Sequence, residues 1–220
     1  MLTTKMVIFD LDGTLVDTLE DLAVSTNVVL EKYGYNTHPI DAYRTFVGNG
    51  VYKLIERALP SEVRSEESIA KMKEDFVEYY DAHLTDFTKP YEGVVETLQT
   101  LKEQGILLAV ATNKPHRQAI RVVEACFPKD LFVQVEGQQD GRPHKPDPRV
   151  IHEIMATHNI KLEEVLYVGD SDVDMETAHN VHIPGIGVAW GFRGEEELKA
   201  NGAYAVISRA SQLLQYIVKK

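Results

Sequence analysis

A short apolar run that ends on two carboxylates constrains the fold of this chain more than any other feature. The run Met6–Phe9 is apolar and too short for a helix, which indicates a strand buried on both faces. Asp10, Asp12 and Gly13 follow it, and glycine suits a tight turn because it tolerates positive φ. Charged groups at the end of a buried strand are costly unless they hold a cation or take part in chemistry. Since ligands of open α/β sheets bind at this edge, we place the candidate site there.

The same order of residues also opens many calcium-binding loops. A calcium loop beginning at Asp10 requires glycine at its sixth position and glutamate at its twelfth. Leu15 and Asp21 occupy those positions, and a strand rather than a helix precedes the loop. This segment alone therefore leaves catalysis and a structural turn open as alternatives.

Composition limits the partners and the compartment. The 220 residues are 44% hydrophobic and 26% charged, as in a soluble globular protein able to bury a core. A formal net charge of -11 disfavours nucleic acid and anionic membranes and favours a small ligand. Asp10 follows the N-terminus too soon for a signal peptide, and Cys126 is the single cysteine. We expect a cytoplasmic protein, either a monomer or a homodimer.

The sequence has two parts with different patterns of apolar residues. Helical spacing after the first strand predicts helices, without a strand between them, at 19–34, 43–46, 51–59 and 69–84. From Pro90 onward helices alternate with strands, and the strands are predicted at 106–111, 131–135, 165–168, 186–189 and 203–207. Helices of this second part are predicted at 94–104, 115–125, 148–158, 175–180, 195–200 and 210–218.

This pattern predicts an α/β fold, a Rossmann-like parallel sheet core flanked by helices, with an inserted all-helical cap domain. Residues 1–15 and 89–220 would form the core, and residues 16–88 the cap. The chain would leave and rejoin the core near Val16–Asp17 and Thr88–Pro90, which are the expected hinges.

Polar groups also follow two later strands. Thr112 and Asn113 come after the strand at 106–111 and directly before a helix, whose N-terminal N–H groups suit a phosphate. Capping of that helix is the alternative. The strand at 165–168 ends in Gly169, followed by Asp170 and Asp174. Two strand ends that carry acids predict an oxygen-rich site for a hard cation, most plausibly Mg²⁺.

Prolines surround a lysine between these two strands. Lys145 lies between Pro143 and Pro146, which stiffen its loop and fix where the ammonium points. Such a lysine is suited to an anion, although a solvated surface lysine is the alternative.

These four segments, in this order, resemble the motifs of the haloacid dehalogenase superfamily of phosphotransferases. The resemblance covers essentially the whole chain, and the helical insertion is similar to that superfamily's first type of cap. Dehalogenases lack the second acid of the first motif, whereas Asp12 is present here, so the resemblance implies phosphoryl transfer.

The resemblance also implies roles for individual residues. Asp10 would be the nucleophile that forms an aspartyl phosphate, and Asp12 the general acid and base. Mg²⁺ would be held by the Asp10 carboxylate, the Asp12 carbonyl and Asp170, with Asp174 orienting the metal shell or the lysine. Thr112 and the Asn113 amide would bind phosphate oxygens, and Lys145 would neutralise Asp10 and the phosphate.

One branch of the superfamily is similar in finer detail. The segments 46–51, 54–59 and 187–193 resemble phosphoglycolate phosphatases, which implies 2-phosphoglycolate as substrate. The residues expected to shape the pocket are Arg44, Gly48, Asn49 and Arg193. For both arginines a solvated surface position is the alternative.

Several other functions stay open. A pyrophosphatase or a broad sugar-phosphate or nucleotide phosphatase would share this fold. A phosphomutase similar to beta-phosphoglucomutase would carry a histidine early in the first cap helix, whereas residues 17–23 contain none and present Leu22. A non-catalytic phosphate-binding protein would be expected to have lost one of the acids, and all four are present.

Overall fold

A parallel sheet of six strands, ordered β5-β4-β1-β6-β7-β8, forms the core of the computed structural model, which describes residues 3–218. The strands are β1 (Met6–Phe9), β4 (Leu107–Pro115), β5 (Gln134–Gln138), β6 (Val165–Gly169), β7 (Gly185–Val188) and β8 (Ala205–Ile207). The chain builds outward from β1 to β5, then returns to β6 on the other side of β1. This change of direction places a ligand-binding crevice at the carboxyl end of β1, as the sequence predicts.

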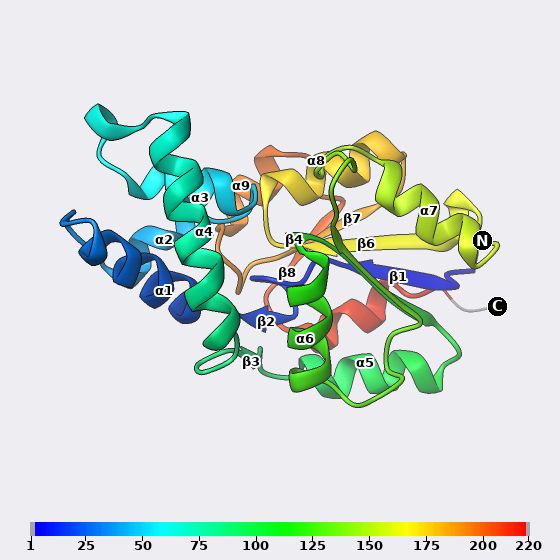
Figure 1. Ribbon diagram of the computed structural model, residues 1–220. Coiled ribbons are helices and arrows are strands. Elements are labelled where there is room, and N and C mark those ends of the chain that lie inside the picture. Colours follow the sequence, from blue (N-terminus) through cyan, green and yellow to red (C-terminus); the bar gives the residue numbers. More distant parts are fainter. Residues whose placement is uncertain (1–2, 219–220) are drawn as a thin grey trace.

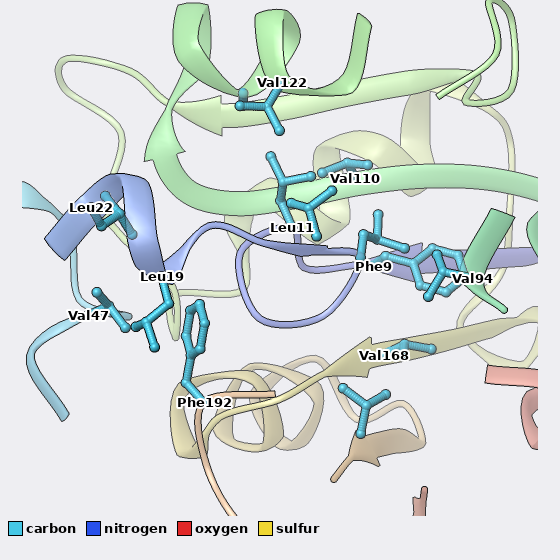
Figure 2. Packing of buried hydrophobic residues seen from close by; sticks show 14 of the residues in the cluster. Phe9, Leu11, Leu19, Leu22, Val47, Val94, Val110, Val122, Val168 and Phe192 are labelled. Atoms are coloured by element: carbon cyan, nitrogen blue, oxygen red, sulfur yellow. The ribbon is translucent and has the colours of Figure 1, made fainter. Parts of the chain in front are cut away.

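The alternating side chains of β1 pack into two hydrophobic layers. Met6 and Ile8 lie in the layer covered by α7 (Arg149–Thr157) and α8 (Asp172–Val181). Val7 and Phe9 lie in the opposite layer, and Figure 2 shows Phe9 there with Val94, Val110 and Val168. The elements of that layer are α5 (Val94–Glu103), α6 (His116–Cys126) and the 3-10 helix η4 (Ala210–Tyr216). Figure 1 shows the sheet between these two sets of helices, which confirms the predicted α/β class.

A group of helices lies beyond the carboxyl edge of the sheet, at the left of Figure 1. It comprises α1 (Leu19–Lys32), η1 (Ile40–Ala42), α2 (Tyr43–Phe46), α3 (Val51–Ala58), η2 (Ser61–Val63) and α4 (Glu66–Ala82). β2 (Val16–Asp17) and β3 (Lys89–Pro90) pair in an antiparallel ladder where the chain enters and leaves this group. This arrangement is consistent with an inserted cap, while the domain boundaries and the hinges stay predictions.

Apolar side chains join these helices to the sheet. Leu19 and Val47 belong to the same buried cluster as Phe192, which follows β7, and Figure 2 shows the three close together. α9 (Glu195–Ala200) and η3 (Leu162–Glu164) complete the order of elements. Within the described part of the chain, no helix has the length and apolar character needed to cross a membrane.

Several predicted boundaries are wrong, including the start of α4, which is Glu66 rather than residue 69, and the start of β8, which is Ala205 rather than residue 203. The strand expected at 131–135 is β5 at Gln134–Gln138, because an edge strand with half-buried residues does not need a continuous apolar run. β4 continues through Pro115 instead of ending at residue 111, with an irregular register after Ala111. The last predicted helix is of the 3-10 type and ends at Tyr216.

A further boundary concerns α8, which begins at Asp172 rather than at residue 175. The Ser171 side chain accepts a hydrogen bond from the Asp174 backbone N–H, so Ser171 caps the helix. The helix therefore starts immediately beyond β6, and Asp174 lies in its first turn. The acid is held by regular helical structure and not by a flexible loop.

Candidate active site

An ion-pair network joins the ends of β1 and β6. The Lys145 ammonium donates hydrogen bonds of 2.8 Å to Asp10 Oδ1, to Asp174 Oδ1 and to the Tyr167 hydroxyl. These three bonds use all the donors of an ammonium group, and the lysine side chain is only 3% exposed. The structure thus brings together Asp10, Lys145 and Asp174, which lie far apart in the sequence.

Burial and charge set the protonation of this network in opposite directions. Burial raises the pKa of Asp10 from 3.8 to about 6, Lys145 opposes that rise, and Asp174 adds to it. For Lys145, burial would lower the pKa, but the carboxylates of Asp10 and Asp174 outweigh it and raise the pKa well above its ordinary value. The lysine therefore stays charged and offsets part of the negative charge around Asp10.

The Asn113 side chain fixes the loop that carries Lys145. Its Oδ1 accepts from the Lys145 backbone N–H at 2.8 Å, and its Nδ2 donates to the Lys145 carbonyl at 3.1 Å. The same Nδ2 lies 3.3 Å from the carbonyl oxygen of Gly48, in the predicted cap. Thr112, also at the end of β4, lines the cavity above Asp10. Thr112, Asn113 and Lys145 therefore line the same cavity, and the Asn113 amide is hydrogen-bonded to the Lys145 backbone.

Three carboxylates form a cluster beside Lys145. Oxygen atoms of Asp10, Asp170 and Asp174 lie within 4.8 Å of one another. Asp170 accepts from the Thr14 hydroxyl at 3.2 Å and from the Phe192 N–H at 2.7 Å. Burial, Asp174 and Asp10 raise the pKa of Asp170 well above its ordinary value. Hard oxygen donors with excess negative charge suit a divalent cation such as Mg²⁺.

Both carboxylate oxygens of Asp174 accept hydrogen bonds from neighbouring residues. Its Oδ2 accepts from the hydroxyl and N–H of Ser171 and from the Asp170 N–H, at 2.6–3.2 Å. Its Oδ1 is taken by Lys145 and Tyr167. Both oxygens are thus occupied, which fits the expected supporting role better than direct contact with a cation. The assignment of metal ligands stays a prediction.

Two glycines leave the space that Asp170 occupies. A Cβ atom on Gly13 would lie 2.3 Å from Asp170 Oδ2, and the residue has φ +86°. A Cβ atom on Gly191 would lie 2.3 Å from the Cβ of Asp170. Any side chain at either position would displace the carboxylate. The turn glycine predicted after the first strand is therefore also needed for close approach.

A second buried lysine contacts the other acid of the first motif. Lys114 Nζ lies 3.1 and 3.3 Å from the two carboxylate oxygens of Asp12, and 2.7 Å from the hydroxyl oxygen of Tyr80 in α4. The lysine side chain is 2% exposed. The Asp12 carboxylate is therefore paired with a lysine that also contacts α4, one of the helices beyond the sheet edge.

A small cavity of about 60 Å³ lies between the sheet edge and these helices. Its polar floor includes Asp10, Asp12, Thr112 and Asp170, and Gly48 and Arg193 also line it. Its apolar wall is formed by Leu22, Val47, Val51 and Leu54. At about 10–15 Å³ for each water, the cavity holds only a handful of water molecules. The site therefore fits a small ligand.

The other predicted pocket residues brace the loop around Gly48. Arg44 Nη1 donates to the Gly191 carbonyl at 3.0 Å, and an Arg193 guanidinium nitrogen donates to the Arg44 carbonyl. Asn49 Oδ1 accepts from Arg57 at 2.8 Å. Among the described residues, Arg44 and Asn49 are not part of the cavity lining. Both contact residues around this loop, and their part in shaping the pocket stays a prediction.

Comparison with known proteins places this arrangement in a family. The family model for haloacid dehalogenase-like hydrolases matches residues 7–188, from β1 through β7. The chain belongs to the haloacid dehalogenase-like hydrolase family. This confirms the resemblance drawn from the motifs, and with it the expectation of an enzyme that hydrolyses phosphoric monoesters.

Individual relatives of this hydrolase agree with the family assignment. It is 37% identical over 194 residues to a phosphoglycolate phosphatase of Mannheimia succiniciproducens, which covers 86% of this chain and 87% of the relative. A phosphoglycolate phosphatase of Haemophilus influenzae is 35% identical over 216 residues, or 96% of each chain. A crystal structure of a putative phosphoglycolate phosphatase from Lactobacillus delbrueckii subsp. bulgaricus superposes with a TM-score of 0.92 at 28% identity, covering 99% of this chain and 100% of that one.

Sequence reasoning missed three residues of this hydrolase's site. Tyr167 interrupts an otherwise aliphatic strand, and a hydroxyl in a buried run signals a polar partner. Lys114 similarly follows a run of buried residues and precedes Pro115, and a charge at such a position signals a partner of opposite charge. Tyr80 carried no signal, because its place at the site depends on how α4 packs.

Proposed function

We propose that this hydrolase is a magnesium-dependent phosphatase that converts 2-phosphoglycolate to glycolate and phosphate through an aspartyl phosphate on Asp10. The observation that carries the proposal is the position of Asp10. Its carboxylate is buried on the cavity floor, is held by Lys145 at 2.8 Å, and lies within a cluster of carboxylates suited to a cation.

In the proposed reaction Asp10 is the nucleophile and Asp12 transfers protons. Lys145 holds Oδ1 of Asp10, and we assign attack on phosphorus to Oδ2. The ester P–O bond breaks, and Asp12 gives a proton to the departing alkoxide oxygen. Asp12 then accepts a proton from a water that attacks the same phosphorus. The bond from phosphorus to Asp10 breaks, which releases phosphate, regenerates the Asp10 carboxylate and leaves Asp12 protonated as at the start.

The surrounding residues hold the phosphoryl group during this sequence. We assign the Thr112 hydroxyl, which lines the cavity, to binding a phosphate oxygen, and the Lys145 charge to offsetting that of the nucleophile and phosphate. Asn113 fixes the Lys145 backbone, so we assign it to positioning that loop as well as to the phosphate region. When bound by Asp10, Asp170 and the Asp12 carbonyl, Mg²⁺ would offset the repulsion between the carboxylates and the phosphate.

The size and lining of the cavity support the choice of substrate. A volume of about 60 Å³ suits a compact ester better than a nucleotide or a sugar bisphosphate. Leu22 lines the cavity in the helix where a phosphomutase would present a histidine, which favours hydrolysis over transfer to a sugar hydroxyl. The relatives at 37% and 35% identity are both named phosphoglycolate phosphatases, which points to the same substrate.

Phosphate release from a panel of esters tests this function. The panel contains 2-phosphoglycolate, pyrophosphate, glucose phosphates and nucleotides, each with Mg²⁺ and with a chelator. We expect a chelator-sensitive release that is fastest for 2-phosphoglycolate. Release led by another compound would reject the substrate, and release insensitive to the chelator would reject the metal dependence.

The metal can also be tested without turnover. Mg²⁺ is expected to raise the melting temperature of the wild-type protein, because it binds the folded carboxylate cluster and relieves its repulsion. Asp170→Asn should remove most of that shift, since it loses one charge of the cluster. Asp140→Asn, at an exposed position, is the matched control and should keep the shift. An equal shift in Asp170→Asn and wild type would place the cation elsewhere.

A further inference from the structure

Two side chains of the cavity wall have a hydrogen-bond donor available to a ligand. The two Asp12 oxygens, 3.1 and 3.3 Å from Lys114 Nζ, can share one N–H of the ammonium, and the Tyr80 oxygen at 2.7 Å takes a second, which leaves a third N–H for a ligand. The Tyr80 hydroxyl accepts from Lys114, and no described residue accepts the hydroxyl's own proton. Burial raises the pKa of Tyr80 to about 12, so the hydroxyl stays protonated. Both side chains are almost fully buried and both line the cavity.

These two donors match the geometry of a carboxylate. The Lys114 nitrogen and the Tyr80 oxygen are 2.7 Å apart, so two oxygens of one carboxylate can each meet one of them. The other cations of the cavity lining are less available. Lys145 has all three donors occupied, and Arg193 is paired with Glu197 and bonded to backbone carbonyls.

The position of this pair relative to Asp12 identifies which part of a substrate would reach it. Asp12 is the acid assigned to the leaving oxygen, and Lys114 Nζ is 3.1 Å from its carboxylate. In 2-phosphoglycolate a single methylene carbon separates the ester oxygen from the carboxylate. An ester oxygen at Asp12 therefore brings the carboxylate beside Lys114 and Tyr80.

We propose that Lys114 and Tyr80 form the subsite that binds the carboxylate of the substrate and so determine its specificity. This inference rests on the proposed function for the identity of the substrate. Because Tyr80 lies in α4 and Lys114 at the end of β4, a bound carboxylate joins the helices beyond the sheet edge to the core. Substrates without a carboxylate lose both hydrogen bonds.

The specificity ratio tests this subsite in the intact protein with Mg²⁺. The ratio compares kcat/KM for 2-phosphoglycolate with that for ethyl phosphate, which has a methyl group in place of the carboxylate. Tyr80→Phe should lower the ratio about tenfold, and Lys114→Met up to about a hundredfold, as expected for hydrogen bonds to a charged group. Lys114→Arg should recover part of the loss. Tyr79→Phe, on the same helix and outside the cavity lining, should keep the wild-type ratio.

Calorimetric binding of glycolate separates this inference from the proposed function. Wild-type protein is expected to bind glycolate, with weaker binding in Tyr80→Phe and in Lys114→Met. If glycolate binds in this way while the ester panel is led by another compound, the subsite stands and the named substrate fails. Glycolate binding that is absent in the wild type, or unchanged in both variants, would overturn the subsite whichever ester is hydrolysed.

Discussion

Replacement of Asp10 by asparagine is expected to reduce phosphate release from 2-phosphoglycolate by roughly 10⁴-fold or more, the scale of removing a covalent nucleophile. The amide keeps the size of the side chain and an oxygen that can accept from Lys145. It also removes a buried charge whose pKa is already raised to about 6 by burial. The melting temperature should therefore not fall. Steady-state rates and circular-dichroism melting measure the two effects.

A neighbouring acid provides the control for this variant. Asp172 lies in the first turn of α8, at the same edge of the sheet, and outside the carboxylate cluster. Asp172→Asn should keep turnover within a few-fold of wild type. Turnover above a few per cent in Asp10→Asn, with the fold intact, would remove Asp10 from the nucleophilic role.

Replacement of Lys145 by methionine is expected to have the largest effect on stability. It leaves Asp10 and Asp174 buried without the cation that each contacts at 2.8 Å. Breaking a buried ion pair in this way costs about 3–5 kcal/mol in the free energy of unfolding. Activity should be lost as well, because the charge facing the phosphate is gone. Urea unfolding measures the loss, and Lys129→Met, at an exposed position, is the control.

The loss of stability in Lys145→Met should depend on pH. The pKa of Asp10 in the folded protein, about 6, exceeds its ordinary value of 3.8, so the folded state binds more protons than the unfolded state between these values. Removing the lysine raises the folded pKa further. The destabilisation should therefore be largest above pH 7 and shrink as the pH falls toward 5. A loss that is equal at pH 8 and pH 5 would show that the carboxylates are not its cause.

The carboxylate site follows closely from the sequence. Met6–Phe9 and Val165–Gly169 are apolar runs that end on acids, and parallel strands bring their carboxyl ends together. The register pairs Phe9 with Val168, which places Asp10 one residue and Asp170 two residues beyond this pair. Local pattern and sheet topology were sufficient here, because the contacts lie between adjacent strands.

Contacts that depend on how the helices pack were not predictable in this way. Tyr80 reaches Lys114 across 34 residues of sequence, and nothing in the helical periodicity of α4 distinguishes it from a core tyrosine. Asn113 makes a contact that the sequence did not predict, while its phosphate-binding role stays a prediction. Its polarity before a helix indicated phosphate, whereas in the structure the amide also holds the Lys145 backbone. The strand predicted at 131–135 begins three residues before β5, because an edge strand lacks the continuous apolar pattern that was used to find it.

Direct trapping of the phosphorylated carboxylate tests the central claim, that the phosphoryl group passes through Asp10. The Asp12→Asn variant lacks the acid of the first step and the base of the second, so the intermediate should form more slowly but persist when 2-phosphoglycolate is added with Mg²⁺ and the reaction is quenched after a long incubation. Borohydride reduction and peptide mass spectrometry would then locate the modified residue. We predict modification of Asp10 in this variant and none in Asp10→Asn. Continued release of phosphate from the substrate with no adduct on Asp10 would contradict the mechanism.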